Sequence, residues 1–396
     1  MCPMVHGSVT CGHRVGRRVI ALVASSFVAA NLAVVGAPPA GAVVPQAADP
    51  KLWQTDGRVR ALARGNGLLY LGGDFSRVHK PNSTSGANRA DLAALKEQYG
   101  GVQAAFRADT DGEVHTIALS ADGAHLFVGG LFSTINGQPR ANLARVDALT
   151  GAVDPWVADT SGEVDRLLVA DDMVFVAGRF GQIQGVHRAG LARISSDSAT
   201  LSTTFKPLPD AYLKALAISP DHRTLYVGGG FLRISGVPRP HVAALDADTA
   251  VASKWFARPH YPPTFFSLSS DGQMLYVAGA GGPTTGNKVS AFPTAGSAET
   301  PFLWDKQGKG NVQALALGAS VVYAGGHFNT FEDQVRKKLV ALNQSDGSLD
   351  PWAPAANSAL GTWTLLATPY GLVAGGDFTT VDGLPQEHLV RFPGTP

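Results

Sequence analysis

Two aspartates and a histidine occupy one repeated position in this chain, directly after a glycine motif. They are Asp74, His327 and Asp377, which follow LYLGG, VYAGG and LVAGG. Two carboxylates and an imidazole that converge can bind a divalent cation or perform acid/base catalysis. The other recognisable copies of the motif carry different chemistry at this position: Leu131, Arg179 and Gly230.

Residues that break a repeat are the best functional candidates, because every repeat has the same structural needs whereas a ligand contacts each repeat differently. The long segment from Ser76 to Ala90 adds His79 to the candidates. The predicted binding residues are therefore Asp74, His79, His327 and Asp377. Asp74, His327 and Asp377 are the candidate metal ligands; no cofactor is expected, although a divalent cation is compatible with them. The alternative is that all four are unrelated, solvated loop residues.

The glycine motif recurs about every 50 residues, so the chain is a repeat protein. The second glycines of the copies are Gly73, Gly130, Gly178, Gly229, Gly279, Gly326 and Gly376. The copy at Gly279 lacks the phenylalanine that follows in the others. Within a copy, apolar residues alternate with a period of two between turn residues, and no helical periodicity is sustained. This pattern predicts an all-β, seven-bladed β-propeller with four antiparallel strands per blade.

A recurrent aromatic residue marks the fourth strand of each copy. Its members are Phe106, Trp156, Phe205, Trp255, Trp304 and Trp352. The chain ends after a third strand, and the missing fourth strand is found near the N-terminus, where Asp49, Pro50 and Trp53 resemble Asp154-Pro155-Trp156. We therefore predict that the N-terminal strand closes the ring by joining the last blade, which leaves no open sheet edge. The tryptophans, Trp53 included, are interpreted as core residues rather than sugar platforms.

The pattern LYVGG-x-F-[ST]-x-[VI]-x-G-x-x-R-x-x-LARL, best shown from Leu126 to Val146, resembles the delta-60 type β-propeller repeat of secreted bacterial proteins. Its double glycine is also similar to that of kelch propellers. The resemblance covers nearly all of residues 43–396 and implies a single β-propeller domain there. It implies no catalytic residues, because the repeat family has none in common.

Other repeated residues are interpreted as structural. The glycines allow a close approach of the backbone where neighbouring blades crowd together. A recurrent arginine could form a polyanion-binding ring, but one register repeated in most blades favours bonds to loop carbonyls or to an acidic residue of the next blade. These arginines are Arg89, Arg140, Arg188, Arg239 and Arg336.

The first 42 residues have the features of a secretory signal peptide. Three arginines come before an apolar run that starts at Val19, and Ala40-Gly41-Ala42 fits a cleavage site. If it were not cleaved, the run would be about long enough to span a bilayer. Both cysteines, Cys2 and Cys11, precede this run, so the mature chain has no thiol. We expect a secreted, extracellular protein with no membrane span after cleavage.

Charge and motifs exclude several classes of function. Without the signal peptide, 29 basic and 31 acidic residues give a net charge of −2, which argues against a nucleic-acid-binding protein. The sequence has no nucleophile elbow, zincin motif, P-loop or EF-hand loop. We predict a secreted, monomeric binding scaffold, not an enzyme, whose extracellular protein or carbohydrate ligand binds one face of the ring. The alternative is an exported hydrolase or lyase that acts on an extracellular polymer at one channel mouth.

Overall fold

The structure, a computed structural model, describes residues 43–280, 287–296 and 298–394. The predicted signal peptide, residues 1–42, lies outside this part of the chain. Every regular element within the described residues is a β-strand, which confirms the all-β prediction. The same residues contain no helix long and apolar enough to cross a membrane.

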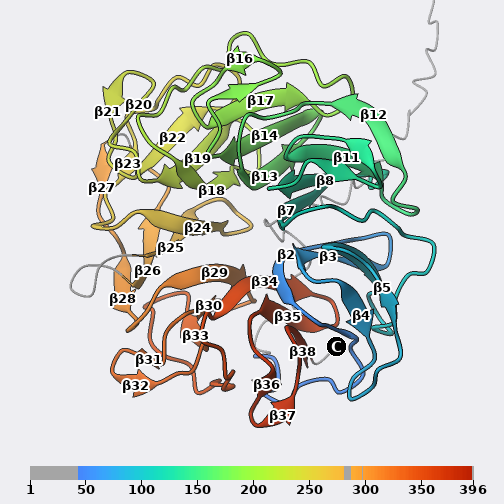
Figure 1. Ribbon diagram of the computed structural model, residues 1–396. Coiled ribbons are helices and arrows are strands. Elements are labelled where there is room, and N and C mark those ends of the chain that lie inside the picture. The colour runs from blue at the N-terminus through green and yellow to red at the C-terminus, as the bar shows by residue number, and fades with distance from the viewer. Residues whose placement is uncertain (1–42, 281–286, 297, 395–396) are drawn as a thin grey trace, which may run out of the picture.

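Each glycine motif forms the middle strand of an antiparallel sheet, between an inner strand and a third strand (Figure 1). The sheets are β2 (Arg58–Gly65), β3 (Leu68–Asp74) and β6 (Leu92–Lys96); β7 (Val114–Leu119), β8 (His125–Gly130), β11 (Leu143–Asp147) and β12 (Val153–Val157); β13 (Val164–Ala170), β14 (Met173–Gly178) and β17 (Leu191–Ser195); β18 (Leu213–Ile218), β19 (Thr224–Gly229) and β22 (Val242–Asp246); β24 (Pro263–Leu268), β25 (Met274–Gly279), β26 (Lys288–Pro293) and β28 (Trp304–Gln307); β29 (Val312–Leu317), β30 (Val321–Gly326) and β33 (Leu339–Asn343); and β34 (Thr362–Thr368), β35 (Gly371–Gly376) and β38 (Leu389–Pro393).

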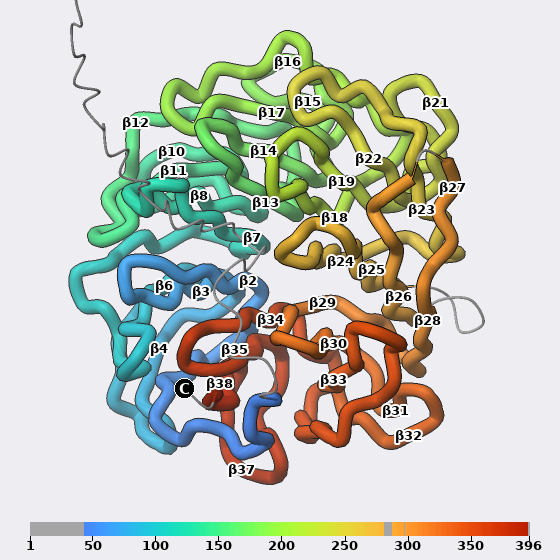
Figure 2. The backbone as a smooth tube through the Cα atoms, turned by 180° about the vertical axis from the view of Figure 1, so that it is seen from behind, coloured from blue at the N-terminus to red at the C-terminus, as the bar shows by residue number. Residues whose placement is uncertain are grey.

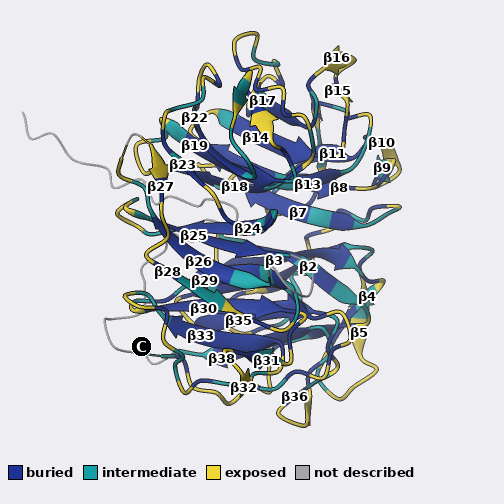
Figure 3. Ribbon diagram, turned by 90° about the vertical axis from the view of Figure 1, so that its left-hand side faces the viewer, coloured by how far each residue is buried: buried dark blue, intermediate teal, exposed yellow. Residues whose placement is uncertain are grey.

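Short strands lie outside these sheets. Most form hairpins between a motif strand and the third strand: β4 (Arg77–His79) with β5 (Gly86–Asn88), β9 (Thr134–Ile135) with β10 (Gln138–Pro139), β15 (Gln182–Ile183) with β16 (Val186–His187), β20 (Arg233–Ile234) with β21 (Val237–Pro238), β31 (Thr330–Phe331) with β32 (Gln334–Val335), and β36 (Thr380–Val381) with β37 (Leu384–Pro385). Two others, β23 (Phe256–Ala257) and β27 (Glu299–Thr300), pair in parallel, and β1 (Gln54–Thr55) pairs with β4. Exposed residues concentrate in these hairpins and the loops, whereas the long strands are buried (Figure 3).

The inner strands lie around a common centre. Each contacts the inner strands of two neighbouring sheets, in the order β2, β7, β13, β18, β24, β29 and β34, and β34 also contacts β2. The first glycine of the last motif shows how close this contact is, because a Cβ on Gly375 would overlap the side chain of Val59 in β2. The second glycine of a motif faces its own sheet instead, since a Cβ on Gly130 would overlap the backbone oxygen of Glu113. The crowding between neighbouring sheets was predicted for the motif, whereas the contact of the second glycine within its own sheet was not.

The fourth strand forms continuous pairs in only some of the described sheets. β28 pairs with β26 over four consecutive residues, and β12 pairs with β11 at two positions with a register shift between them. Elsewhere the outer segment makes a single bridge to the third strand: Leu95 with Val102, Ile194 with Leu201, Leu245 with Ala252, and Leu342 with Leu349. The aromatic residue of this segment is nevertheless buried against the motif strand, as the edge-on contact of Phe205 with Phe175 at 5.5 Å between ring centroids illustrates. Packing of the aromatic residue thus anchors the outer segment where hydrogen bonding is sparse.

The N-terminal segment lies against the last sheet (Figure 2). The backbone N–H of Asp49 donates to the oxygen of Arg391 in β38 at 2.7 Å, and the two side chains form an ion pair. The backbone N–H of Lys51 donates to the carboxylate of Asp49, and in the second repeat the backbone N–H of Trp156 donates in the same way to Asp154. By this hydrogen bond, Lys51 is the residue equivalent to Trp156. Leu52 is completely buried in a cluster shared by the first and last sheets, and Trp53 packs against it.

In the fifth copy, a tyrosine from outside the motif packs against the glycine of the motif. Tyr261, before β24, is buried with its ring against Gly279. Its hydroxyl lies 2.6 Å from Ser290 Oγ, which donates to Asp305 at 2.6 Å. Tyrosine can be buried here because its hydroxyl has a hydrogen-bond partner.

The repeated arginines bond to backbone carbonyls, which confirms one of the two structural roles predicted for them. Arg140 donates from Nη1 to the oxygen of Pro139 and from Nη2 to that of Asp154, both at 2.7 Å. The same pair of bonds, to the preceding residue and to the outer segment of the same repeat, recurs at Arg89, Arg188, Arg239 and Arg336. These side chains therefore tie the outer segment to the sheet.

Candidate functional site

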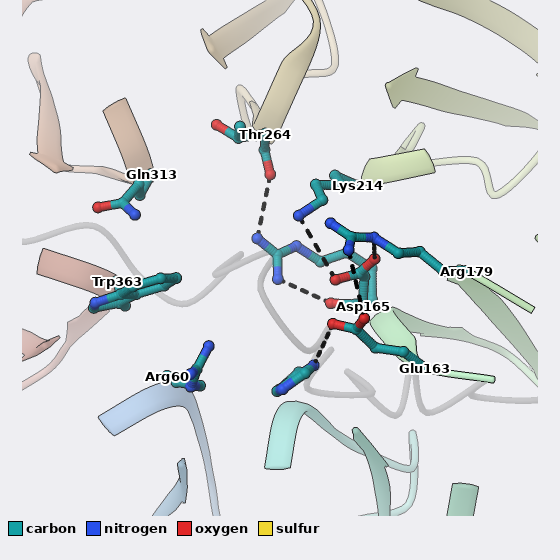
Figure 4. A pocket seen from close by; sticks show the side chains of 10 residues that line it. Arg60, Glu163, Asp165, Arg179, Lys214, Thr264, Gln313 and Trp363 are labelled. Carbon is teal, nitrogen blue, oxygen red and sulfur yellow. Dashed lines mark hydrogen bonds and ion pairs between the residues drawn. The ribbon is translucent and has the colours of Figure 1, made fainter. Parts of the chain in front are cut away.

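The inner strands share a break in their pairing near the first residue. Each skips one residue in its register with the motif strand, as between Val59 and Ala61 in β2. The skipped residues are Arg60, His115, Asp165, Lys214, Thr264, Gln313 and Trp363. A residue in such a bulge leaves the ladder and is aimed differently from its neighbours. All of these side chains line one central cavity of about 290 Å³, together with Glu163, Arg166 and Arg179 (Figure 4).

An acidic cluster with a histidine forms one side of the cavity. His115 lies between two carboxylates, with Nδ1 3.0 Å from Glu163 and Nε2 3.1 Å from Glu113. Asp165 is only 8% exposed. Its carboxylate oxygens lie 3.7 Å from Nε of Arg179 and 3.9 Å from Nζ of Lys214 (Figure 4). These distances exceed those of direct hydrogen bonds, so the cations neutralise Asp165 only loosely.

Arg166 adds a further positive charge to the lining of the central cavity, which we call the channel. It pairs with Ala177 at the register where other inner strands carry mostly alanine or threonine, such as Ala61 and Thr116. Its guanidinium donates to the backbone oxygens of Asp165 at 2.9 Å and of Thr264 at 3.2 Å. Burial lowers the pKa of this guanidinium, and the Asp165 carboxylate opposes that effect.

The opposite wall combines an aromatic ring with polar groups. Arg60 lies 4.8 Å from the centre of the Trp363 ring and pairs with Glu113 at 2.8 Å. Burial lowers the pKa of Arg60, opposed first by the charge of Glu113. Burial also lowers the pKa of Lys214, and here Asp165 opposes the effect. The cavity therefore holds positive charge that is removed from water and incompletely compensated.

Several buried atoms of residues that line the cavity have no hydrogen-bond partner among the described residues. The acceptors are Asp165 Oδ2 and Gln313 Oε1, and the donors are Nε of Arg60, Nε of Arg166 and Nε1 of Trp363. Buried polar atoms are rarely left unpaired in native proteins. Both kinds of atom belong to residues that line one cavity, so small side-chain rotations would offer donors and acceptors to a ligand there.

The residues predicted from the sequence lie at different places. Asp74 pairs with Arg58. Burial lowers the pKa of Arg60, and the charge of Asp74 is one of those that partly oppose this effect, so Asp74 lies close enough to the cavity to act on its lining. His79 is buried, with Nε2 3.1 Å from Glu387.

The other two predicted residues lie near Ser358. His327 and Ser358 line a separate cavity of about 640 Å³, and the hydroxyl of Ser358 is 3.5 Å from the Asp377 carboxylate. The metal set of Asp74, His327 and Asp377 stays a prediction. The group of described residues whose ligand atoms all lie within 4.8 Å of one another is His115, Glu163 and Asp165.

Residues that break the repeat do line the cavity, as the sequence predicts for functional residues. Most of them, however, do not come from the position after the glycine motif. Arg179, from the variable position after the glycine motif, does line the cavity. The larger contribution comes from the skipped residue of each inner strand, which is the second letter of VRALA, VHTIA, LKALA and VQALA and differs in all four. That difference was present in the sequence and is the signal by which the channel residues could have been found.

Comparison with known proteins agrees with this architecture. Residues 125–155 match the model of a family described as "Domain of unknown function (DUF5122) beta-propeller". The β-propeller domain of Cps50 (Swd1) from Myceliophteria thermophila is similar with a TM-score of 0.54 and 11% identity, over 87% of this chain and 98% of that one. The WD40 β-propeller domain of Doa1 gives 0.53 and 10%, over 89% and 96%. The chain is a β-propeller repeat protein.

A chain of the Mitotic Checkpoint Complex is also similar to this β-propeller, with a TM-score of 0.60 and 15% identity over 91% of this chain and 98% of that chain. None of the curated proteins matches it. At such low identities the structural likeness concerns the fold alone. The function must therefore be argued from the channel.

Proposed function

We propose that this protein is a secreted, monomeric, seven-bladed β-propeller that works as a binding scaffold, with its ligand in the central cavity. The observation that carries the proposal is the convergence of the variable inner-strand residues on one cavity, although the residues around them repeat. A repeat has no structural reason to place an arginine, a histidine, an aspartate and a tryptophan at equivalent positions. A ligand that contacts each blade differently supplies such a reason.

The finer architecture belongs to the same proposal. We infer four strands per blade of the delta-60 type and a ring closed by the N-terminal strand. The hydrogen bond and ion pair between Asp49 and Arg391 and the contact of β34 with β2 support closure. The leader sequence supports secretion, and an extracellular protein or carbohydrate is the corresponding partner.

The test is a ligand screen by thermal shift on residues 43–396, with extracellular polysaccharides and their fragments. We expect a ligand that raises the melting temperature of the parent protein but not of Trp363→Ala or Asp165→Asn. The matched control is Lys309→Met, because Lys309 is 71% exposed and pairs with Asp333 at the surface. Ligands that stabilise the channel variants as strongly as the parent would contradict a site in the channel.

A second candidate is an exported hydrolase or lyase, and the geometry of His115 favours it. An imidazole between two carboxylates, 3.0 and 3.1 Å away, can relay a proton at the cavity wall. Release of reducing ends or of unsaturated products from a polymer, lost in His115→Ala, would identify an enzyme. A divalent cation is a further candidate ligand of His115, Glu163 and Asp165, and titration with calcium, manganese and zinc tests it.

A further inference from the structure

We propose that the channel cavity binds a hydroxylated carboxylate, one sugar-acid unit in size. This inference rests on the proposed function and names the chemical class of its ligand. The sugar acid can be a free molecule or one unit of an acidic polysaccharide. Charge, unpaired polar atoms and size support it independently.

The charge of the lining is positive. Arg60, Arg166, Arg179 and Lys214 line the cavity with Glu163 and Asp165, and Glu113 pairs with Arg60, so four cations stand against three carboxylates, an excess of one positive charge. In the described part of the chain no carboxylate lies within ion-pair distance of Arg166, whose hydrogen bonds go to two backbone oxygens. Arg166 is half-buried, and its guanidinium also lies 5.2 Å from the centre of the Phe265 ring. Because no carboxylate neutralises it, an anion that pairs with Arg166 would be bound favourably.

The ion pairs already present leave donors free for an anion. Arg179 and Lys214 approach Asp165 only to 3.7 and 3.9 Å. A guanidinium has five N–H donors and an ammonium three. Burial lowers the pKa of Arg60, Arg166 and Lys214, and an added negative charge would raise these pKa values towards their usual range. The lining is therefore preorganised for an anionic group.

The unpaired acceptors argue for hydroxyl groups on the same ligand. Asp165 Oδ2 and Gln313 Oε1 need donors, which a bare carboxylate or a fully ionised phosphate cannot supply. The unpaired Nε1 of Trp363 needs an acceptor. A hydroxyl both donates and accepts, so a hydroxylated acid satisfies both sets.

The size of the cavity limits the ligand to one unit. A volume of about 290 Å³ lies at the lower end of small-molecule pockets, which span roughly 300–1,000 Å³.

The residues that line the cavity are less suited to a metal ion than to a sugar acid. Both ring nitrogens of His115 already face carboxylates, and a cation at Glu163 and Asp165 would meet Arg179 and Lys214 as like charges.

The experiment is calorimetric titration of residues 43–396 with D-galacturonate, D-galactose, inorganic phosphate and trigalacturonate. Galactose is the matched control, because it has the galacturonate ring but no carboxylate. We expect galacturonate or trigalacturonate to bind at least about tenfold more tightly than galactose and phosphate, since one charge-assisted hydrogen bond of 1.5–3 kcal/mol is worth about that factor. Binding of the trimer alone would identify the polymer as the source of the acid.

Two variants place the binding in the channel. Arg166→Met and, separately, Lys214→Met should each weaken galacturonate at least about tenfold, because each removes a donor to the anion. Lys214 is a second route if Arg166→Met does not fold. The surface variant Lys309→Met should leave binding unchanged.

The outcomes separate the two proposals. Galactose or phosphate that binds as tightly as the acids, with sensitivity to Trp363→Ala, overturns the sugar-acid inference and keeps the channel site. Failure of both acids to bind overturns the inference, while the thermal-shift screen still decides on the channel. Binding of galacturonate that is unchanged in Arg166→Met, Lys214→Met and Trp363→Ala overturns both.

Discussion

Replacement of Asp91 by asparagine should stabilise this protein in a pH-dependent way. Asp91 has a left-handed backbone, with φ +63°, and is partly buried. Its carboxylate accepts from the N–H of Phe75 at 3.0 Å and from the hydroxyl of Thr110 at 3.4 Å. Burial, assisted by the charges of Asp74 and Glu113, raises the pKa of Asp91 from 3.8 to about 7.

The sign and size of the effect follow from this pKa. A carboxyl whose pKa is raised by folding is favoured in its neutral form, so the free energy of unfolding falls as the pH rises from about 4 to about 7. Each tenfold change in proton affinity corresponds to about 1.4 kcal/mol, which gives about 4 kcal/mol for the full difference. Since Asp91 is partly exposed, solvent screening reduces the expected cost to about 1–2 kcal/mol at pH 8.

Asparagine removes this cost because it carries no charge. The second repeat shows that the residue is compatible with the position: Asn142 has φ +66° and donates from Nδ2 to the oxygen of Thr160 at 3.0 Å. We therefore expect Asp91→Asn to gain about 1–2 kcal/mol at pH 8 and little at pH 4.

Urea denaturation of the parent and of Asp91→Asn at pH 4, 6 and 8 measures the difference. The matched control is Asp333→Asn, because Asp333 also has a left-handed backbone, with φ +57°, but its side chain is 87% exposed. The control should show no comparable change with pH. A gain for Asp91→Asn that is the same at pH 4 and pH 8 would refute the electrostatic reasoning.

Three further predictions concern closure, processing and metal binding. Deletion of residues 49–56 should lower the melting temperature by several degrees in calorimetry, because it removes the partner of Arg391 and a buried leucine worth about 2–5 kcal/mol; an unchanged melting temperature would contradict closure by the N-terminal strand. N-terminal sequencing of the exported protein should begin near Val43, whereas full-length chain in membranes would show an anchor. Alanine at Asp74, His327 and Asp377 together tests the metal set predicted from the sequence: loss of calcium, manganese or zinc binding in titration, with the melting curve intact, would support this set, and retained binding would exclude it and favour His115, Glu163 and Asp165.

The repeated parts of the fold could be predicted because the same physical demand appears many times. Alternation with a period of two predicted the strands, and the glycines and arginines had the close contacts and carbonyl bonds expected of them. Single substitutions within the pattern were harder to predict. Tyr261, which lies outside the motif, packs against Gly279 of the copy without the phenylalanine, and only the three-dimensional packing reveals this contact.

The channel could not be predicted from alternation for a related reason. Arg60 stands between Val59 and Ala61, and a polar residue between two apolar ones is typical of a solvated strand face. The bulge and the surrounding inner strands turn this position towards the centre instead. His115 and Glu163 are 48 residues apart, so their contact also depends on how neighbouring sheets are placed. The variable residue of each inner strand was visible in the sequence, but the direction of its side chain was not.

The bulge in each inner strand separates the residue that lines the cavity from the residues that pack the sheets together. A skipped residue such as Gln313 or Lys214 has no partner in the ladder, whereas the apolar residues on either side of it, such as Val312 and Leu213, are fully buried. Substitutions at these positions can therefore change the chemistry of the channel while the packing between sheets is conserved. A new ligand specificity would need only a few changes of one residue each, and every sheet offers one such position.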